Sequence, residues 1–291
     1  MAILYFGDPQ GVLKLIENGA EIVGIVHGRV GGPGWRRLFA LLSSKQLEIP
    51  RWRRPDLNDP KIIDVLADTT PSLLVSCFYP DLIPPELLAL APGLNVHPSD
   101  LPEWRGPDPI IHTILSGQTR TAICVHELTQ ALDAGDIYER VEVEVNPTSD
   151  AGTLSVDLEA QGADMMAQFA LTWLRDGPTP AQAQSGSISW APQRDEDWWE
   201  IDWTRPAIDI ERFIRAAHPH PGAYTGIGDE LLVIQKASVA AAGHFDSLAP
   251  GSPFTRDHEF FIKCGVDALC LHWLKLGRRR MRGRDFARLL H

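Results

Sequence analysis

The sequence is poor in several features that mark particular classes of protein. It has 4 cysteines in 291 residues, and their spacing fits neither a disulfide framework nor a zinc site. No apolar run approaches the roughly 18 residues of a membrane span, and no basic region precedes the apolar start "MAILYF" as it would in a signal peptide. We therefore expect reduced core thiols in a cytoplasmic protein with no membrane partner.

Basic residues are also scarce. There are 27 Lys and Arg against 38 Asp and Glu, which gives a net charge of −11. This balance disfavours a broad nucleic-acid surface but allows a local one, because binding depends on patches of charge. Residues 195–211 hold seven carboxylates and one arginine, whereas residues 275–288 hold seven basic residues and one acid. The second segment is open to two interpretations, a phosphate-binding surface or a solvated terminal segment.

The remaining composition is that of a globular protein, with 44% hydrophobic and 22% charged residues. Apolar patterns predict helices that alternate with strands up to about residue 175. The strands are expected at 2–6, 21–27, 72–78, 93–97, 121–128 and 136–145, and the helices at 12–18, 35–44, 60–67, 82–90, 109–116 and 153–175. This alternation predicts an α/β fold with a Rossmann-like, mainly parallel sheet and helices on both faces. Its ligand crevice should lie beyond the carboxyl ends of the strands.

The pattern changes after residue 175. The stretch "DGPTPAQAQSGSISWAPQ" is rich in Pro, Ser and Gln and has no periodicity, which is typical of a linker. Beyond a helix at 207–217, short strands separated by Gly and Pro indicate a small β-barrel of OB-like type. We therefore predict a catalytic domain at 1–180, a linker at 181–204 and a β-barrel domain at 205–291.

Polar side chains mark the end of the strand at 93–97. Asn95 and His97 are two residues apart, so both point to the same face of the strand. The stretch "ALDAGDIY" (131–138) adds Asp133 in a turn between two predicted strands. A carboxamide, an imidazole and a carboxylate in one crevice can donate to an oxyanion and move a proton. An ordinary polar strand end and a turn-forming aspartate are the alternative interpretation.

No nucleophile accompanies these three groups. Ser99 lacks the glycine-flanked elbow of hydrolases, and the two cysteines of this domain lie in apolar strands. The turn "GDPQG" after the first strand lacks the spacing of a nucleotide loop. His112, His126, His218 and His220 share no metal-ligand spacing, so no metal is expected. The residues thus favour direct transfer between two bound substrates.

The segments "LNVHPSDLPEWRGPDPIIHTILSG" and "TAICVHELTQALDAGDIY" resemble the core of the 10-formyltetrahydrofolate-dependent formyltransferases. Members of that family act on methionyl-tRNA, glycinamide ribonucleotide or amino-sugar nucleotides. "FIRAAHPHPGAYTGIGDELLVIQKA" and "LKLGRRRMRGRDFARLL" resemble the C-terminal barrel of the methionyl-tRNA and aminoarabinose types. The resemblance implies that Asn95, His97 and Asp133 are the catalytic set, with the family's separation of 36 residues between His97 and Asp133. It also implies 10-formyltetrahydrofolate as the formyl donor, released as tetrahydrofolate.

The resemblance further implies where the folate binds. The loop after the histidine and the loop that carries the aspartate hold it in the family, and "YPDLIP" resembles the family's pterin-contacting loop. Core packing is the alternative role for Leu82 and Ile83. The implied folate-binding residues are Asp81, Leu82, Ile83, Ser99, Leu101, Pro102, Thr129, Gln130, Ala131 and Leu132.

The acceptor is less defined by the resemblance. Asp100 stands where the family usually has leucine, and Pro107-Asp108 replaces the Ala-Ala of methionyl-tRNA enzymes. The basic insertion that holds tRNA in those enzymes is reduced to residues 28–37, with three arginines. We therefore expect the acceptor to be the primary amine of a small molecule or carrier-bound group, such as a nucleotide amino sugar or an amino-acid derivative. The expected acceptor contacts are Asp108, Arg29, Arg36 and Arg37.

Two alternatives remain open. Methionyl-tRNA is a possible but less favoured acceptor, supported by the retained C-terminal domain and its basic tail. A non-catalytic folate- or RNA-binding relative is disfavoured because the Asn95, His97 and Asp133 set is intact. No pattern in the sequence predicts self-association.

Overall fold

The computed structural model describes residues 2–28, 31–228 and 230–289, and it divides into two compact units. The first unit consists of residues 1–109, 120–144 and 156–192, and the second of residues 110–119, 145–155 and 193–291. The last division between them, at Pro192 and Gln193, falls inside the segment 181–204 that the sequence predicts as a linker. Residues 182–191 belong to the first unit and are bonded to its loops, so this part of the segment is not a free connection.

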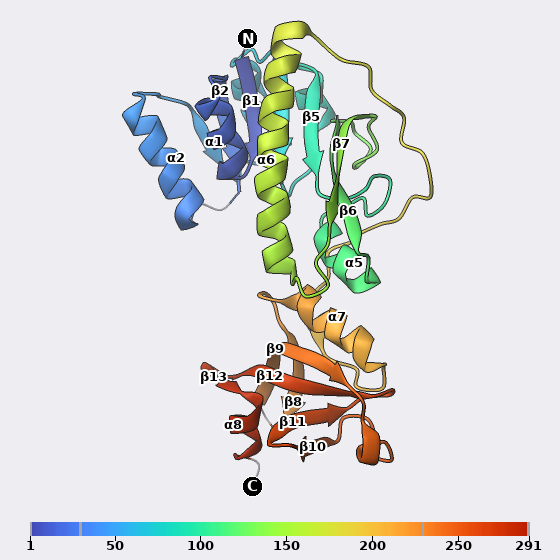
Figure 1. Ribbon diagram of the computed structural model, residues 1–291. Coiled ribbons are helices and arrows are strands. Elements are labelled where there is room, and N and C mark those ends of the chain that lie inside the picture. Colours follow the sequence, from blue (N-terminus) through green and yellow to red (C-terminus); the bar gives the residue numbers. More distant parts are fainter. Residues whose placement is uncertain (1, 29–30, 229, 290–291) are drawn as a thin grey trace. The chain divides into compact units, whose positions relative to one another are not determined.

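A seven-stranded sheet forms the centre of the first unit (Figure 1). Its order is β3-β2-β1-β4-β5-β6-β7, in which the first five strands pair in parallel and the last two pair antiparallel. The strands are β1 (Ala2–Gly7), β2 (Glu21–His27), β3 (Arg51–Arg53), β4 (Leu73–Cys77), β5 (Gly93–His97), β6 (Arg120–Glu127) and β7 (Ile137–Glu144). This arrangement confirms the predicted mainly parallel sheet.

The helices largely follow the predicted positions. They are α1 (Pro9–Glu17), α2 (Gly32–Ser44), α3 (Pro60–Ala67), α4 (Pro85–Leu88), α5 (Pro109–Ser116), α6 (Ala151–Asp176), α7 (Ala207–Ala217) and α8 (Gly283–Ala287). Asp8 caps α1 by accepting from the Gly11 N–H at 3.1 Å, and Asp59 caps α3 through the Lys61 N–H at 3.0 Å. A proline at the first turn of each of these two helices needs no hydrogen bond there, so caps and prolines together set the helix starts.

The core of the first unit explains why the predicted strands are correct. β4 is buried at every position, as a central strand covered on both faces should be. One cluster of fully buried side chains joins β1, β4 and the surrounding helices; it includes Leu4, Phe6, Leu66, Leu74 and Leu87. All four cysteines are buried and free. The sheet is therefore a rigid base for the loops at its carboxyl end.

The second unit is built on an antiparallel sheet. Its main order is β10-β11-β12-β9-β8, and β13 pairs with β12. The strands are β8 (Ala223–Ile227), β9 (Glu230–Ala240), β10 (Pro253–Arg256), β11 (Glu259–Lys263), β12 (Ala268–Leu276) and β13 (Arg279–Arg282). The β-rich domain is as predicted, but no pairing among the described strands joins β8 to β10, so the sheet does not close into a ring. The basic segment 275–288 forms the end of β12, β13 and α8.

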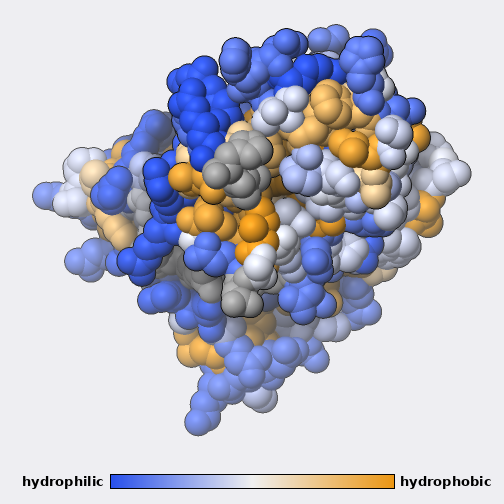
Figure 2. Space-filling model, turned by 90° about the horizontal axis from the view of Figure 1, so that it is seen from below, coloured by the Kyte–Doolittle hydropathy of each residue, from blue (hydrophilic) through white to orange (hydrophobic). Residues whose placement is uncertain are grey.

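No helix among the described residues combines the length and apolar character that crossing a membrane requires. Figure 2 shows that apolar residues on the face seen from below gather in patches with hydrophilic residues at their borders. Most charged side chains of the chain are at the surface, whereas His97, His126 and Asp133 are among its few buried titratable groups. Because burial of polar groups is costly, these three side chains are candidates for the functional site.

Candidate active site

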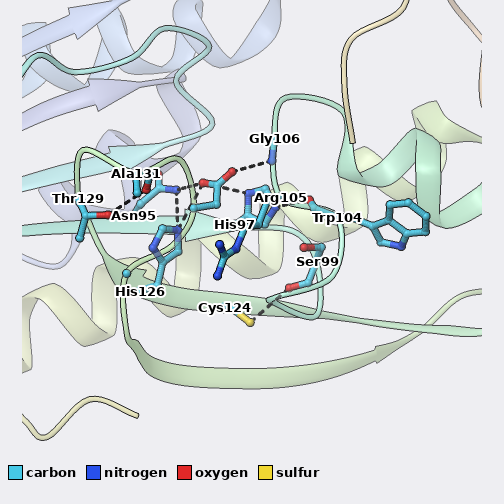
Figure 3. Close-up of polar contacts among 12 residues, drawn as sticks. Asn95, His97, Ser99, Trp104, Arg105, Gly106, Cys124, His126, Thr129 and Ala131 are labelled. Atoms are coloured by element: carbon cyan, nitrogen blue, oxygen red, sulfur yellow. Dashed lines mark hydrogen bonds and ion pairs between the residues drawn. The ribbon is translucent and has the colours of Figure 1, made fainter. Parts of the chain in front are cut away.

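Two neighbouring strands bring a carboxamide and an imidazole together. Asn95 on β5 lies directly opposite His126 on β6 in the antiparallel register. The Nδ2 atom of Asn95 is 3.0 Å from Nε2 of His126 (Figure 3). His97 lies two residues along β5, and its ring centroid is 6.3 Å from that of His126. Asn95 and His97 were predicted to lie on one face of the strand, and the structure adds a second histidine, His126, beside them.

Asp133 reaches these side chains from a tight turn between β6 and β7. Its backbone has φ of 49°, in the left-handed region that residues with a side chain seldom adopt. The turn passes so close to β6 that a Cβ on Gly135 would clash with the Glu127 carbonyl oxygen, which only glycine avoids. Asp133 is 9% exposed. The turn thus presents a carboxylate to a nearly closed site.

The carboxylate of Asp133 contacts all the candidate catalytic groups. Its Oδ2 atom accepts from the Gly106 backbone N–H at 2.8 Å. Its Oδ1 atom is 3.6 Å from Nδ1 of His97, 3.6 Å from Nε2 of His126 and 3.5 Å from Nδ2 of Asn95. One carboxylate oxygen is fixed by the backbone, and the other faces two imidazoles and an amide.

The hydrogen bonds also decide where the imidazole protons lie. Nε2 of His97 is 2.9 Å from the Trp104 carbonyl oxygen, and a carbonyl only accepts, so Nε2 carries the proton. Nδ1 of neutral His97 is then a free base that faces Asp133. Likewise, Nδ1 of His126 donates to the Glu127 carbonyl at 2.8 Å, which leaves its Nε2 to accept from Asn95. A proton gained by His97 at Nδ1 would point directly at the Asp133 carboxylate.

The charges at neutral pH follow from burial and these contacts. Burial lowers the pKa of His97 below its ordinary value, and it outweighs the Asp133 carboxylate, which acts in the opposite direction. Burial alone would raise the pKa of Asp133, but His97, His126 and the Gly106 N–H together lower it. Asp133 is therefore ionised and His97 neutral near pH 7. This is the state in which His97 can accept a proton beside a stabilising negative charge.

A cavity opens from this cluster between two loops. It measures about 80 Å³. Its lining residues are Ser76, Tyr79, Asp81, Leu82, Ile83, Asn95, His126, Leu128, Thr129, Leu132 and Asp133. This volume is that of a few water molecules. Leu82 is 68% exposed at the entrance, where it can cover a ring bound in the cavity.

The Tyr79 hydroxyl gives this cavity an unsatisfied polar group. It is buried without a hydrogen-bond partner among the described residues. Burial and the nearby Asp81 carboxylate raise the pKa of Tyr79 to about 12, so the hydroxyl keeps its proton. A hydroxyl that keeps its proton beside apolar walls can donate to a flat heterocycle with polar edges.

The other predicted folate residues are placed differently. Gln130 and Ala131 are exposed on the turn, and the Ala131 carbonyl accepts from the Thr129 hydroxyl at 2.9 Å. Ser99 and Leu101 are buried: the Ser99 carbonyl accepts from Cys124, and Leu101 packs on Ala122 and Cys124. The structure therefore brings Asp81, Leu82, Ile83, Thr129 and Leu132 together. Gln130, Ala131, Ser99, Leu101 and Pro102 do not line the cavity.

The predicted acceptor residues do not form a cluster with one another. Arg36 and Arg37 are exposed on α2, and Arg37 pairs with Glu17 at 2.9 Å. Arg29 lies outside the described residues. Asp108 is partly buried, and its N–H donates to the Ala191 carbonyl at 3.1 Å. The unusual Asp100 has a local partner, because Arg140 on β7 donates to both of its carboxylate oxygens at 2.6 Å.

Sequence patterns missed two polar side chains of the site. His126 has no metal spacing with other histidines, but its place opposite Asn95 gives it a role in the cluster. Gln184 lies in the stretch predicted as a linker, yet its Nε2 atom donates to the carbonyls of Asp133 and Gly135, both at 2.8 Å. No group of three His, Cys, Asp or Glu within the described residues is arranged to hold a metal ion.

Comparison with known families covers both units. Residues 20–169 match the model of the formyl transferase family, and residues 195–290 match the model of the formyl transferase C-terminal domain. The methionyl-tRNA formyltransferase of Chloroflexus aurantiacus is 32% identical, with 96% of this chain and 94% of that protein aligned. That of Bacillus subtilis is 30% identical over 99% of this chain and 95% of that protein.

Solved structures share the fold at low identity. WlaRD, a sugar 3N-formyltransferase determined with dTDP and 5-N-formyl-tetrahydrofolate, has a TM-score of 0.67 at 14% identity, covering 93% of this chain and 97% of that one. HypX from Aquifex aeolicus, in complex with tetrahydrofolic acid, has a TM-score of 0.65 at 16% identity and covers 99% of this chain. The chain spans about half of HypX, 46% of its length. With both of its parts matched, the chain belongs to the formyl transferase family, the N-formyltransferases that use 10-formyltetrahydrofolate as formyl donor.

Proposed function

We propose that Asn95, His97 and Asp133 transfer the formyl group of 10-formyltetrahydrofolate directly to a primary amine. The observation that carries this proposal is the position of Asp133 Oδ1, 3.6 Å from the free Nδ1 of His97 and 3.5 Å from the Asn95 amide. A base and an amide donor then meet at one carboxylate oxygen, and Asn95 and Asp133 also line the cavity. The donor binds in the cavity between the 79–83 loop and the 129–133 turn.

Each side chain has a separate task. His97 accepts at Nδ1 the proton that the amine loses as its nitrogen attacks the formyl carbon. Asp133 stabilises the imidazolium formed, and His97 then passes the proton to the folate nitrogen as the bond from that nitrogen to the formyl carbon breaks. Asn95 donates to the formyl oxygen as negative charge develops there. Its 3.5 Å contact with Asp133 is at the limit of hydrogen-bond length, so this N–H turns toward the formyl oxygen at little cost.

As acceptor we propose a compact amine, either a small molecule or a carrier-bound group. The supporting observation is charge. The first unit has 23 acidic and 13 basic residues, a net charge of −10, whereas the second has 15 and 14, a net charge of −1. A polyanion such as tRNA is repelled by a unit with this balance. The exposed Arg36 on α2, and Arg37 once it leaves its exposed pair with Glu17, can meet one phosphate or carboxylate of a smaller acceptor.

Methionyl-tRNA is the second candidate, and different observations favour it. The curated relatives named methionyl-tRNA formyltransferases align over nearly the whole chain at about 30% identity. The second unit also contains a cavity of about 750 Å³ whose lining includes Arg212, Arg215, Lys236 and Arg280. Such a cavity could hold phosphates of a nucleic acid.

One assay distinguishes the two acceptors. The purified chain is incubated with 10-formyltetrahydrofolate and either charged methionyl-tRNA or a panel of amino sugars, nucleotide amino sugars and amino-acid derivatives, and products are read by mass. We expect a formylated compact amine, and tRNA binding that weakens steeply as salt rises. Efficient formylation of methionyl-tRNA at physiological salt would instead establish the second candidate. Absence of any formylated product with an intact fold would contradict the proposed activity.

A further inference from the structure

The segment after α6 forms a strap across the loops that carry the candidate catalytic groups. We define the strap as residues 182–191. In Figure 1 the chain that follows α6 runs back along the β6–β7 side of the sheet. Gln182 pairs with Ile137 of β7 through two backbone hydrogen bonds of 2.8 Å. The strap is thus attached to the sheet at the residue where β7 begins.

The other end of the strap is bonded to the loop after His97. Ser189 accepts at its hydroxyl from the Trp104 N–H at 2.9 Å and at its carbonyl from the Arg105 N–H at 3.0 Å. The Ala191 N–H donates to the Arg105 carbonyl at 2.7 Å. Trp104, which holds His97 through its carbonyl, has φ of 57°, so this loop is held in a conformation that costs energy.

Gln184 contacts both loops at once. Its Nε2 atom donates to the carbonyls of Asp133 and Gly135 at 2.8 Å, and its Oε1 atom accepts from Nη2 of Arg105 at 2.6 Å and from Nε at 3.2 Å. Arg105 directly precedes Gly106, whose N–H fixes the Asp133 carboxylate. The amide of Gln184 therefore joins the turn of Asp133 to the loop that holds His97.

We propose that Gln184 is a positioning residue of formyl transfer, and that it acts by keeping the Asp133 carboxylate in register with Nδ1 of His97. This inference rests on the roles proposed for His97 and Asp133. The present Oδ1–Nδ1 distance is 3.6 Å, so it shortens to a hydrogen bond only when the imidazole gains its proton. The Asp133 backbone has φ of 49°, a conformation that costs energy, and the two Gln184 bonds to the turn stabilise it. Displacement of a catalytic group by about 1 Å can reduce turnover by about a hundredfold.

The test uses Gln184→Ala with Gln182→Ala as a matched control. Gln182 is exposed, and its contacts with Ile137 are made by the backbone. We expect Gln184→Ala to lower kcat about tenfold to a hundredfold, while the KM for the folate donor changes less than about threefold. Gln182→Ala should match the wild type in both constants. Equal kcat in Gln184→Ala and the wild type would overturn the proposal, and so would a loss confined to KM.

A double-mutant cycle with Asp133→Asn separates this proposal from the proposed function. If Gln184 acts through Asp133, adding Gln184→Ala to Asp133→Asn lowers kcat less than about threefold further. A full additional loss would mean that Gln184 only supports the fold, and would overturn the positioning role. An unaffected Asp133→Asn variant would instead contradict the catalytic assignment itself. Should Gln184→Ala fail to fold, Gln184→Glu replaces it, because the ionised side chain keeps its bond to Arg105 but cannot donate to the turn.

Discussion

The two compact units of this chain differ in the polar groups that line their cavities. In the first unit, Asn95, His97 and His126 gather around the buried Asp133 carboxylate, and backbone carbonyls fix the tautomers of the two histidines. In the second, Lys236 and Arg280 line a wide cavity without a carboxylate partner among the described residues, and Arg280 lies 4.6 Å from the centre of the Trp273 ring. A buried polar network holds catalytic groups in one arrangement, whereas cations without a carboxylate partner at a cavity can bind an anion.

Because of this difference, the formyl-transfer step and the choice of acceptor can be tested independently. The network concerns the transfer of the formyl group, which is the same for every amine. The net charges of the two units, −10 and −1, influence which class of amine acceptor binds. Substitutions in the catalytic network of the first unit should therefore alter turnover with any acceptor, and substitutions at the cavity of the second unit should matter only if the acceptor is anionic and large.

The largest effect is expected from Asp133→Asn and His97→Ala. Each removes one member of the proton-transfer pair, so kcat should fall by about 10²–10⁴ with whichever amine is used. Steady-state kinetics measure the loss, and circular dichroism with urea unfolding shows that each variant is folded. Turnover near that of the wild type in either variant would remove the assigned role.

The pH dependence of kcat/KM tests the same network. The active form contains neutral His97, whose pKa burial holds below the ordinary value of 6.5. Activity should therefore persist as pH falls through 6.5 and decline only below it. In Asp133→Asn the carboxylate that raises the pKa of His97 is gone, so the acid limb of the residual activity should move to still lower pH. An acid limb centred above the ordinary pKa of histidine would contradict the assignment of a neutral His97 beside an ionised Asp133. A shift of that limb to higher pH in Asp133→Asn would contradict it as well.

A smaller effect should separate the two acceptors at the second unit. Lys236→Glu combined with Arg280→Glu reverses two cations of the large cavity. If methionyl-tRNA is the acceptor, its KM should rise about tenfold or more at low salt, with a weaker salt dependence. If the acceptor is a compact amine, as we propose, its KM should stay within about twofold. A tenfold rise for a compact amine would place that amine's binding site in this cavity.

The smallest effect concerns α2 of the first unit. Arg36→Glu with Arg37→Glu should raise the KM for a phosphate- or carboxylate-bearing acceptor several-fold, roughly the effect of losing one or two exposed ion pairs. The KM for the folate donor should not change, because neither arginine lines the donor cavity. Glu17→Gln is a control, since it frees Arg37 from its ion pair without adding charge to α2. An unchanged acceptor KM in the double variant would exclude these arginines from acceptor binding.

Much of the fold could be predicted from the sequence. Residues 21–27, 60–67, 93–97 and 207–217 adopt the predicted elements with the predicted bounds, because hydrophobic periodicity and capping are local properties. β3 was missed because its three residues, Arg51–Arg53, carry no apolar pattern and pair only at the edge of the sheet. The antiparallel sheet of the second unit was also predicted, whereas the order of its strands along an open path was not, since strand count and turns do not determine it.

The sequence by itself determined that Asn95 and His97 share a face, because side chains two apart on a strand always do, and that Asp133 follows in a turn. Only the tertiary structure decided what surrounds them. His126 becomes part of the cluster through the antiparallel register of β5 and β6, and Gln184 through a segment without periodicity that folds back onto the turn of Asp133, 51 residues earlier in the chain. Proton positions likewise depend on the Trp104 and Glu127 carbonyls. The contacts of Asn95 with His126 and of Gln184 with Asp133 join residues 31 and 51 positions apart, so local patterns contain no record of them. The two carbonyl contacts join residues close in the chain, but the folded loops set their geometry, and burial makes each contact costly to lose.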